Sequence, residues 1–324
     1  KAARRTYAKD IAFWQAVQYL FYTQWQALKE YANSKHIQII GDLPIYIALD
    51  SVDVWSSPQD FQLDADLNPT EVAGCPPDGF SATGQLWGNP LYDWDAMAQN
   101  GYAWWVRRIR HMCSIYDVVR IDHFRGFAGY YAIPYGNKTA EGGRWRTGPG
   151  YALFAAIKKK LGEPRIIAED LGFLTDDVNA LLRKCGYPGM KVLEFGFDSR
   201  DGGDYRPHGY PVNSIAYVGT HDNEPVNGWM ATAAPEDVAR AVRYLNLTKQ
   251  EGYHWGMMRG IWASAAELSI VQAQDLLGLG HEARMNTPST LGGNWCWRAK
   301  RGAFNDRLAV KLHDLTELYG RLPE

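Results

Sequence analysis

The chain has 324 residues, a hydrophobic fraction of 46% and a formal net charge of -2. This length suits one domain of barrel size or two smaller ones, and the near-neutral charge argues against nucleic acid or an anionic membrane surface as a partner. No apolar run reaches the roughly 18 residues of a membrane-spanning helix, and no signal-type start is recognised. The four cysteines are widely spaced and lack a CxxC pair, so we expect a cytoplasmic protein without a disulfide framework or a zinc site.

Apolar residues at helical spacing predict an amphipathic helix over residues 11–31. A predicted strand, IQII at 37–40, runs into the stretch GDLPIY, where Asp42 lies at its carboxyl end. Residues 48–95 are rich in Pro, Gly, Asp and aromatic residues and show little periodicity. We predict that this segment is a functional loop or a small subdomain inserted after the GDLPIY strand.

Strands and helices then alternate along the rest of the chain. The predicted strands are VVRID, RIIAED, KVLEFGF at 191–197, SIAYVGT and LSIVQA at 268–273. Helices are predicted before the first of these strands and near 151–161, 178–182, 236–245, 253–266 and 309–318. This alternation predicts an α/β fold with a parallel sheet, and polar strand ends that feed helices are typical of the catalytic face of a (β/α)8 TIM barrel. We count six strands, so we expect 1–324 to be a partial catalytic barrel, the carboxyl-terminal six βα units with the first strands missing.

Three of the predicted strands end in a carboxylate: Asp122, Glu169 and Asp222. Strand ends on one barrel rim converge on a common centre, and two converging carboxylates are what glycoside cleavage requires. Arg120 lies two residues before Asp122 on the same strand face, where its charge would keep that carboxylate ionised. Glu169, beside Asp170 and after apolar residues, is the better candidate for an acid with a raised pKa.

Other interpretations exist for each of these residues. A charged strand end is often only a solvated rim position, although three such ends favour a shared site. His123 and His221 could be metal ligands beside an Asp or Glu, as in metal-dependent hydrolases. Each His is adjacent to its Asp, and neighbouring residues in a strand point to opposite faces, which argues against that reading. The aromatic residues Trp87, Tyr92 and Trp94 either stack on a ring-bearing ligand or pack in a core.

Seven stretches of the sequence resemble the amylomaltase family, the 4-α-glucanotransferases or disproportionating enzymes, which are relatives of the α-amylases. In chain order they are GDLPIYIALDSVDVW (41–55), VAGCPPDGFSATGQLWGNPLYDW (72–94), VRIDHFRGF (119–127), IIAEDLG (166–172), PGMKVLEFGFD (188–198), GTHDN (219–223) and QDLLGLGHEARMNTPSTLGGNWCWR (274–298). They cover nearly the whole chain in the family's order, so the resemblance is specific.

The resemblance implies a role for each matching residue. Asp122 matches the family's nucleophile, Glu169 its general acid/base and Asp222 the transition-state stabiliser that binds sugar hydroxyls. The implied substrate-binding positions are Asp42, Arg120, His123 and His221 in the same site, Gln85 and Trp87 on a mobile loop over the acceptor side, and Phe195 and Asn286. No cofactor and no metal ion is implied.

The implied reaction transfers segments of α-1,4-glucans or maltooligosaccharides to acceptor sugars by a retaining double displacement. It predicts a separation of about 5 to 5.5 Å between the carboxyl groups of Asp122 and Glu169, and a lid bearing Trp87 that excludes water. The alternatives are an α-amylase-type hydrolase with the same carboxylates and an inactive carbohydrate-binding fragment.

The resembling enzymes carry a considerable segment before the helix that precedes GDLPIY. That segment supplies the first two barrel strands and donor-side sugar contacts. A barrel without it would expose long strand edges and apolar interior surface. We therefore predict that the amino-terminal segment, held non-covalently, is a partner of this chain.

Overall fold

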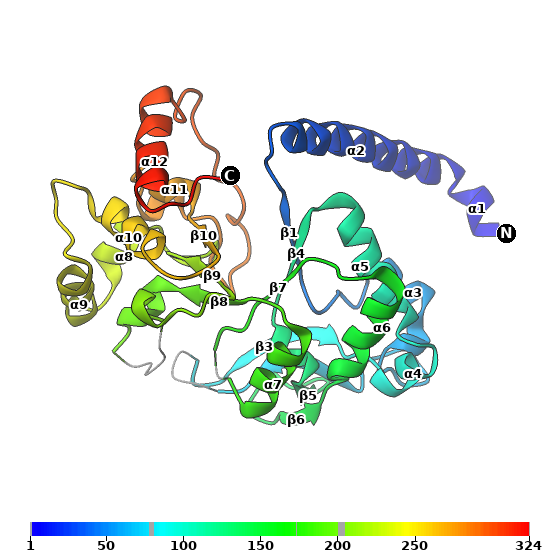
Figure 1. Cartoon of the computed structure of the whole chain (residues 1–324). Helices are drawn as coiled ribbons and strands as arrows, with labels where there is room; N and C mark the ends of the chain where they lie inside the picture. The colour runs from blue at the N-terminus through cyan, green and yellow to red at the C-terminus, as the bar shows by residue number, and fades with distance from the viewer. Residues whose placement is uncertain (1, 78–80, 173, 200–204, 324) are drawn as a thin grey trace. The chain divides into compact units, whose positions relative to one another are not determined.

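A computed structural model of the chain describes residues 2–77, 81–172, 174–199 and 205–323 (Figure 1). The chain divides into two compact units, Lys1–Tyr187 and Pro188–Glu324, and each unit has its own three-stranded parallel sheet. Residues 78–80, which belong to the quoted stretch 72–94 and to the segment 48–95, lie outside the described residues. Within the described ranges no helix is both long enough and apolar enough to cross a membrane.

The parallel sheet of the first unit has the strand order β1-β4-β7. Its strands are β1 (Ile40–Leu43), β4 (Val118–Ile121) and β7 (Ile166–Ala168). The helices of this unit are α1 (Ala2–Thr6), α2 (Ala8–Ser34), α3 (Val52–Ser56), α4 (Trp94–Gln99), α5 (Ala103–Ile115), α6 (Tyr151–Leu161) and α7 (Asp176–Cys185), with short 3-10 turns η1 (Pro58–Asp60) and η2 (Phe124–Phe127). Every residue of β4 and β7 is buried, as expected for short apolar strands of a parallel sheet. The predicted alternation of helix and strand is present, with α5 leading into β4 and α6 into β7.

The first strand begins later than the sequence predicts, at Ile40 instead of Ile37. In the structure the side chains of Ile37 and Ile40 are exposed, whereas that of Leu43, at the end of the observed strand, is buried. Asp42 consequently lies within the strand, opposite Arg120 of β4. Gly41 allows this register, because a Cβ at that position would overlap the ring of Tyr116.

An antiparallel sheet of four strands, in the order β3-β2-β5-β6, belongs to the same unit. Its strands are β2 (Glu71–Cys75), β3 (Gln85–Pro90), β5 (Gly129–Pro134) and β6 (Arg144–Thr147). Two of them lie in the segment 48–95 and two between the predicted strand VVRID and the helix predicted near 151–161. The sequence does not predict these strands, because each is short and its partners are distant in the chain.

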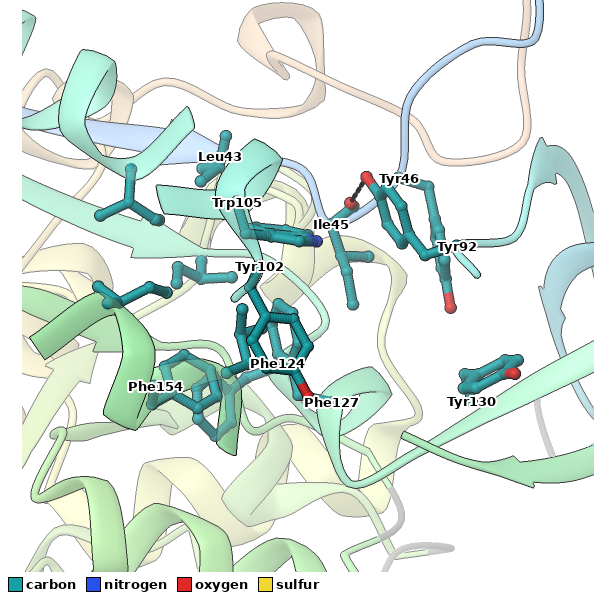
Figure 2. Close-up of a cluster of buried hydrophobic side chains, with 14 of the residues drawn as sticks. Leu43, Ile45, Tyr46, Tyr92, Tyr102, Trp105, Phe124, Phe127, Tyr130 and Phe154 are labelled. Atoms are coloured by element: carbon teal, nitrogen blue, oxygen red, sulfur yellow. Dashed lines mark hydrogen bonds between the residues drawn. The ribbon is translucent and has the colours of Figure 1, made fainter. Parts of the chain in front are cut away.

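An aromatic core holds the first unit together (Figure 2). Trp105, Phe124, Phe127 and Phe154 are fully buried. Phe127 meets the other three rings edge to face, with 5.1 Å between its centroid and that of Trp105, and Phe124 stacks on Phe154. Tyr92 belongs to the same core, and its hydroxyl donates a hydrogen bond of 2.7 Å to the carbonyl oxygen of Ile45. Tyr92 is therefore a structural aromatic residue. Trp87 and Trp94 are partly buried and pack against this core.

The second unit has a parallel sheet in the order β10-β9-β8. Its strands are β8 (Gly189–Val192), β9 (Ser214–Tyr217) and β10 (Leu268–Ile270). Its helices are α8 (Val226–Thr232), α9 (Pro235–Leu245), α10 (Tyr253–Trp262), α11 (Ala273–Leu276) and α12 (Asp306–Leu318), with 3-10 turns η3 (Leu193–Phe197), η4 (Pro207–Gly209) and η5 (His281–Ala283). The helices α9, α10 and α12 begin and end close to where the sequence predicts.

The stretch KVLEFGF at 191–197 is only partly the strand that was predicted. β8 ends at Val192, and the following residues form the 3-10 turn η3. Leu193, Glu194 and Phe197 are buried whereas Phe195 is only partly buried, a pattern that fits a helical turn and not an alternating strand. The turn places Glu194 and Phe195 immediately after the strand.

Candidate active site

An ion-pair cluster stands where β1 and β4 end. The guanidinium of Arg120 lies 2.6 Å from Asp42 Oδ2 and 3.2 Å from Asp122 Oδ1. The Arg120 side chain is 10% exposed, whereas those of Asp42 and Asp122 are 44% and 45% exposed. The buried cation therefore holds two accessible carboxylates, and the ion pair between Arg120 and Asp122 that the sequence predicts is present.

Glu169 follows β7 and is buried beside this cluster. Its carboxylate accepts hydrogen bonds from the backbone N–H groups of His123, at 2.7 Å, and Leu171, at 2.8 Å. Burial raises the pKa of Glu169 to about 7, with a further contribution from the charge of Asp122, while Arg120 and the two hydrogen bonds act in the opposite direction. The predicted raised pKa is present, and the carboxyl group is about half protonated near neutral pH.

The chain turns sharply immediately after Asp122. His123 has a left-handed backbone with φ of 50°, so its side chain leaves the direction of the strand. Burial, followed by the charge of Arg125, lowers the pKa of His123 to about 4, so its imidazole is neutral at pH 7. Its ring meets Trp87 edge to face, with 4.9 Å between the centroids. The argument that His123 and Asp122 point to opposite faces fails here, because the two residues do not continue the strand.

Gln85 and Trp87 lie in strand β3, which corrects the prediction that they belong to a mobile loop. The Trp87 indole N–H donates to Gln85 Oε1 at 3.0 Å, and its ring also lies 6.1 Å from that of Tyr46. The two residues are thus held on the same face of a hydrogen-bonded sheet that borders His123. Gln85 and Trp87 belong to a strand because β3 pairs with β2, and the sequence does not predict this pairing.

A second group of predicted residues lies in the second unit, after β9. Asp222 Oδ1 accepts a hydrogen bond of 2.6 Å from the Asn286 side chain, and its Oδ2 lies 3.4 Å from His221 Nε2. The Asn286 backbone N–H donates to the carbonyl oxygen of His221 at 3.1 Å. His221 and Asp222 were expected to point to opposite faces, but β9 ends at Tyr217 and both residues lie in a turn, where their side chains meet.

Several residues of this second group were not predicted from the sequence. Arg284 Nη1 lies 2.6 Å from Glu224 Oε1, and its Nη2 donates to the carbonyl oxygen of Asp222 at 2.6 Å. The Trp295 ring stands 5.0 Å from that of His221. Their positions in the sequence could have indicated these residues. Glu224 directly follows GTHDN, and Arg284 lies in HEARMN, within the stretch 274–298 that resembles the family.

Phe195 lies in η3 of the second unit, with its ring edge to face against Tyr205 at 5.7 Å. Glu194, the residue before it, is buried, and one of its oxygens has no hydrogen-bond partner among the residues that the structure describes. Burial raises the pKa of Glu194 well above its usual range, and the charge of buried Asp275 adds to the effect. These two carboxyl groups were not predicted from the sequence.

The described part of the chain contains no group of three or more His, Cys, Asp or Glu side chains that could hold a metal ion. His123 contacts Trp87, and His221 contacts Trp295 and Asp222. The imidazole rings of these two histidines therefore lie against aromatic rings and, for His221, the Asp222 carboxylate.

A family model described as 4-alpha-glucanotransferase matches residues 1–304. The chain belongs to the 4-alpha-glucanotransferase family. Every site residue predicted from the sequence lies within the matched range. The stretches that carried the resemblance therefore belong to the family's own sequence pattern.

Relatives within the 4-alpha-glucanotransferase family are similar over nearly all of this chain. The 4-alpha-glucanotransferase of Clostridium butyricum is 51% identical over 97% of this chain and 65% of its own length. That of Streptococcus pneumoniae is 49% identical over 99% of this chain and 64% of its own length. This chain thus spans slightly less than two thirds of the length of these relatives.

Among solved structures, the amylomaltase of Streptococcus agalactiae in complex with acarbose matches with a TM-score of 0.95 and 44% identity. The match covers 99% of this chain and 65% of the amylomaltase chain. It assigns an α/β fold of the TIM-barrel type to this member of the 4-alpha-glucanotransferase family.

Proposed function

We propose that this chain carries the catalytic residues of a 4-alpha-glucanotransferase, which moves segments of α-1,4-glucans onto acceptor sugars. The observation that carries the proposal is the contrast between two neighbouring carboxyl groups. Asp122 is accessible and paired with Arg120, whereas Glu169 is buried with a pKa raised to about 7. One group is suited to remain an ionised nucleophile and the other to carry a proton.

In the first half-reaction an oxygen of the Asp122 carboxylate attacks the anomeric carbon of the glucan. The bond from that carbon to the glycosidic oxygen breaks, and Glu169 gives its proton to the departing oxygen. The products are a covalent glucosyl ester on Asp122, an ionised Glu169 and a shortened glucan. His123 N–H, which donates to Glu169, supports the ionised state that this step creates.

In the second half-reaction the ionised Glu169 takes a proton from the 4-hydroxyl of an acceptor sugar. That oxygen attacks the anomeric carbon, and Asp122 leaves as a free carboxylate. Two inversions retain the configuration of the transferred sugar. The partly buried Trp87 is proposed to stack on the acceptor and keep water away, so that transfer is faster than hydrolysis.

The remaining predicted residues are proposed to bind the sugar. In the first unit these are Asp42, Arg120, His123, Gln85 and Trp87, and in the second unit Asp222, His221, Asn286 and Phe195. Asp222 is proposed to bind sugar hydroxyls and to stabilise the transition state. The hydrogen bond that Asp222 Oδ1 accepts from the Asn286 side chain supports a defined orientation of this carboxylate.

Maltooligosaccharides and longer α-1,4-glucans are the proposed substrates. The amylomaltase of Streptococcus agalactiae was solved in complex with acarbose, which supports a sugar oligomer as the ligand class. We further propose that the chain supplies six βα units of the barrel over 1–324, with 48–95 as an insertion after β1. A reducing cytoplasm remains the proposed location, supported by the spacing of the four cysteines.

The test is to incubate the purified chain with maltotriose and to resolve the products by chain length over time. We expect glucose together with a ladder of products longer than maltotriose, while the total number of reducing ends stays constant. Rising reducing ends with only shorter products would instead identify an α-amylase-type hydrolase. Binding of maltotriose without turnover would identify a carbohydrate-binding fragment.

A crystal structure with a bound maltooligosaccharide tests the stereochemistry. We expect the Asp122 and Glu169 carboxyl groups to be about 5 to 5.5 Å apart, as in retaining enzymes. A separation near 8 Å would leave room for a water molecule and would contradict the double displacement.

A further inference from the structure

Arg284 joins two loops of the second unit through three separate acceptors. Its Nη1 reaches Glu224 Oε1 at 2.6 Å, its Nη2 the carbonyl oxygen of Asp222 at 2.6 Å, and its Nε the carbonyl oxygen of Asn286 at 2.9 Å. Asp222 and Glu224 follow β9, whereas Arg284 and Asn286 follow η5. A planar guanidinium with fixed donor directions can hold such a set of acceptors, and a lysine ammonium cannot.

These contacts hold both Asp222 and Asn286, two residues that are proposed to bind the sugar. Arg284 holds the backbone of Asp222 directly, and it holds the backbone of Asn286, whose side chain donates to Asp222 Oδ1 at 2.6 Å. The Asn286 N–H in turn donates to the carbonyl oxygen of His221. These hydrogen bonds hold the two loops in a fixed position relative to each other. The side chain of Asp222 is still 42% exposed.

The charge of Arg284 is directed away from that carboxylate. Its ionic partner is Glu224, whose side chain is only 13% exposed and also lies 2.9 Å from His281 Nδ1. Asp222 meets Arg284 through its uncharged carbonyl oxygen. Arg284 thus orients Asp222 without pairing with its negative charge, which leaves that charge available to a ligand.

We propose that Arg284, with Glu224 as its counter-ion, is a positioning residue for Asp222, acting through the backbone of Asp222 and through Asn286. The inference rests on the proposed function, because Asp222 is assigned its role there. A group displaced by about 1 Å from its reacting partner can cost roughly 100-fold in rate. Loss of the Arg284 contacts is therefore expected to lower kcat by about 100-fold, with a much smaller change in KM.

The test is a double-mutant cycle in the disproportionation of maltotriose. Arg284→Ala, Asp222→Asn and the double variant are compared with the wild-type chain. If Arg284 acts through Asp222, adding Arg284→Ala to the Asp222→Asn variant lowers kcat by less than about threefold. Multiplicative losses in the double variant would overturn the proposal. A wild-type chain that transfers no glucan would overturn the proposed function itself, which separates the two failures.

Arg259 offers a matched control in the same unit. It pairs with Glu251 at 2.7 Å, donates to the carbonyl oxygen of Leu245 at 3.0 Å and is similarly shielded, and neither of these two partners is a site residue. Arg259→Ala is expected to lower the melting temperature without the loss in kcat. Any small effect of Arg259→Ala on kcat should be the same in the wild-type chain and in the Asp222→Asn variant, so that the effects of the two substitutions multiply.

Chemical rescue of kcat by added guanidinium gives a second test, because kcat would not recover if Arg284 only stabilised the fold. Millimolar guanidinium is expected to raise kcat of Arg284→Ala at least about tenfold, and not that of Arg259→Ala. Arg284→Lys should retain the fold and fall between wild type and Arg284→Ala, because one ammonium cannot hold three divergent acceptors. A variant Arg284→Ala with wild-type kcat, or one that guanidinium fails to rescue, would contradict the positioning role.

Discussion

Glu169 combines the features of a general acid/base in one side chain. Burial and the nearby charge of Asp122 raise its pKa to about 7, while backbone N–H groups of His123 and Leu171 limit the rise. A pKa near the operating pH allows the group both to donate and to accept a proton. Both halves of the proposed reaction need this property.

The pH dependence of transfer follows from this pKa. Below pH 7 Glu169 is mainly protonated and can act as the acid, and above pH 7 it ionises, so kcat/KM should fall on the alkaline side with a midpoint near 7. Glu169→Gln is expected to lower kcat by about 100- to 10,000-fold and to remove this alkaline limb. Initial rates of maltotriose disproportionation between pH 5 and 9 provide the check. Glu163→Gln, at an exposed carboxylate paired with Lys158, should leave the profile unchanged.

Asp275 links the stability of the second unit to pH. It is fully buried, one oxygen accepts from Val226 N–H at 2.7 Å, and within the described part of the chain the other has no hydrogen-bond partner. Burial raises its pKa from 3.8 to about 7. Between these two values the unfolded chain has lost the proton while the folded chain keeps it, so the free energy of unfolding decreases as pH rises.

We predict that this group alone lowers the free energy of unfolding by on the order of 4 kcal/mol between pH 4 and 8. Asp275→Asn keeps an oxygen for Val226 N–H and removes the charge, so most of that pH dependence should disappear. Urea unfolding of both proteins at pH 5 and pH 8 measures the difference. An unchanged pH dependence in the variant would mean that Asp275 ionises in the folded protein at its ordinary pKa.

At the scale of elements, the pairing of β2 with β3 places Gln85 and Trp87. Cys75 is paired with Gln85, and the register shifts between Val72 and Gly74. A Cβ at Gly74 would overlap the carbonyl oxygen of Gln85 and the side chain of Ile133. This close backbone approach requires glycine, because the carbonyl oxygen cannot move without shifting β3.

Gly74→Ala is therefore expected to destabilise the first unit by about 1–3 kcal/mol. Because β3 carries Trp87, the same change should raise the ratio of hydrolysis to transfer. Urea unfolding and product analysis with maltotriose measure the two effects. Gly129→Ala, in β5 of the same sheet, is the matched control, because its Cβ would meet only the Arg146 carbonyl oxygen at 3.4 Å. A Gly74→Ala protein as stable as this control would refute the argument.

At the scale of the whole molecule, helix α2 carries an apolar surface that remains exposed. None of its residues is buried, although the helical periodicity of 11–31 predicts a buried face. Its contacts with the rest of the first unit include a hydrogen bond between the Tyr22 hydroxyl and His111 Nε2, and one that the Trp25 indole N–H donates to the carbonyl oxygen of Ile115. The large exposed apolar side chains of α2 are Ile11, Phe13, Trp14, Tyr19, Leu20, Phe21, Tyr22, Leu28 and Tyr31. So many exposed large apolar side chains on one helix indicate an interaction site.

We predict that this surface binds the part of the 4-alpha-glucanotransferases that this chain does not span. Co-expression with the remaining part of the Clostridium butyricum relative should give a complex in which α2 is protected from hydrogen exchange. Phe13→Glu with Trp14→Glu should abolish the complex, because both side chains are more than half exposed and apolar. Arg4→Glu, on α1, is a control expected to leave it intact. A complex that survives the paired substitutions would place the contact elsewhere.

The amino-acid sequence by itself determined the longer helices, three of the buried parallel strands and the carboxylates that follow them. Helical periodicity marked α5, α6, α7 and α9, and apolar runs marked β4, β7 and β9, because both signals are local and repeat within a few residues. Asp122, Glu169 and Asp222 could be singled out because a polar residue that ends a buried run is visible in the sequence. The family could be recognised for the same reason, from contiguous stretches in a fixed order.

Only the tertiary structure decided which distant segments meet. The antiparallel sheet that holds Trp87 depends on pairing between short strands far apart in the chain, and the later start of β1 depends on packing of Gly41 against Tyr116. The side-by-side placement of His221 and Asp222 depends on where β9 ends. The pKa of Glu169 and the contacts of Arg284 depend on burial and on partners more than 40 residues away, which no local pattern of side chains encodes.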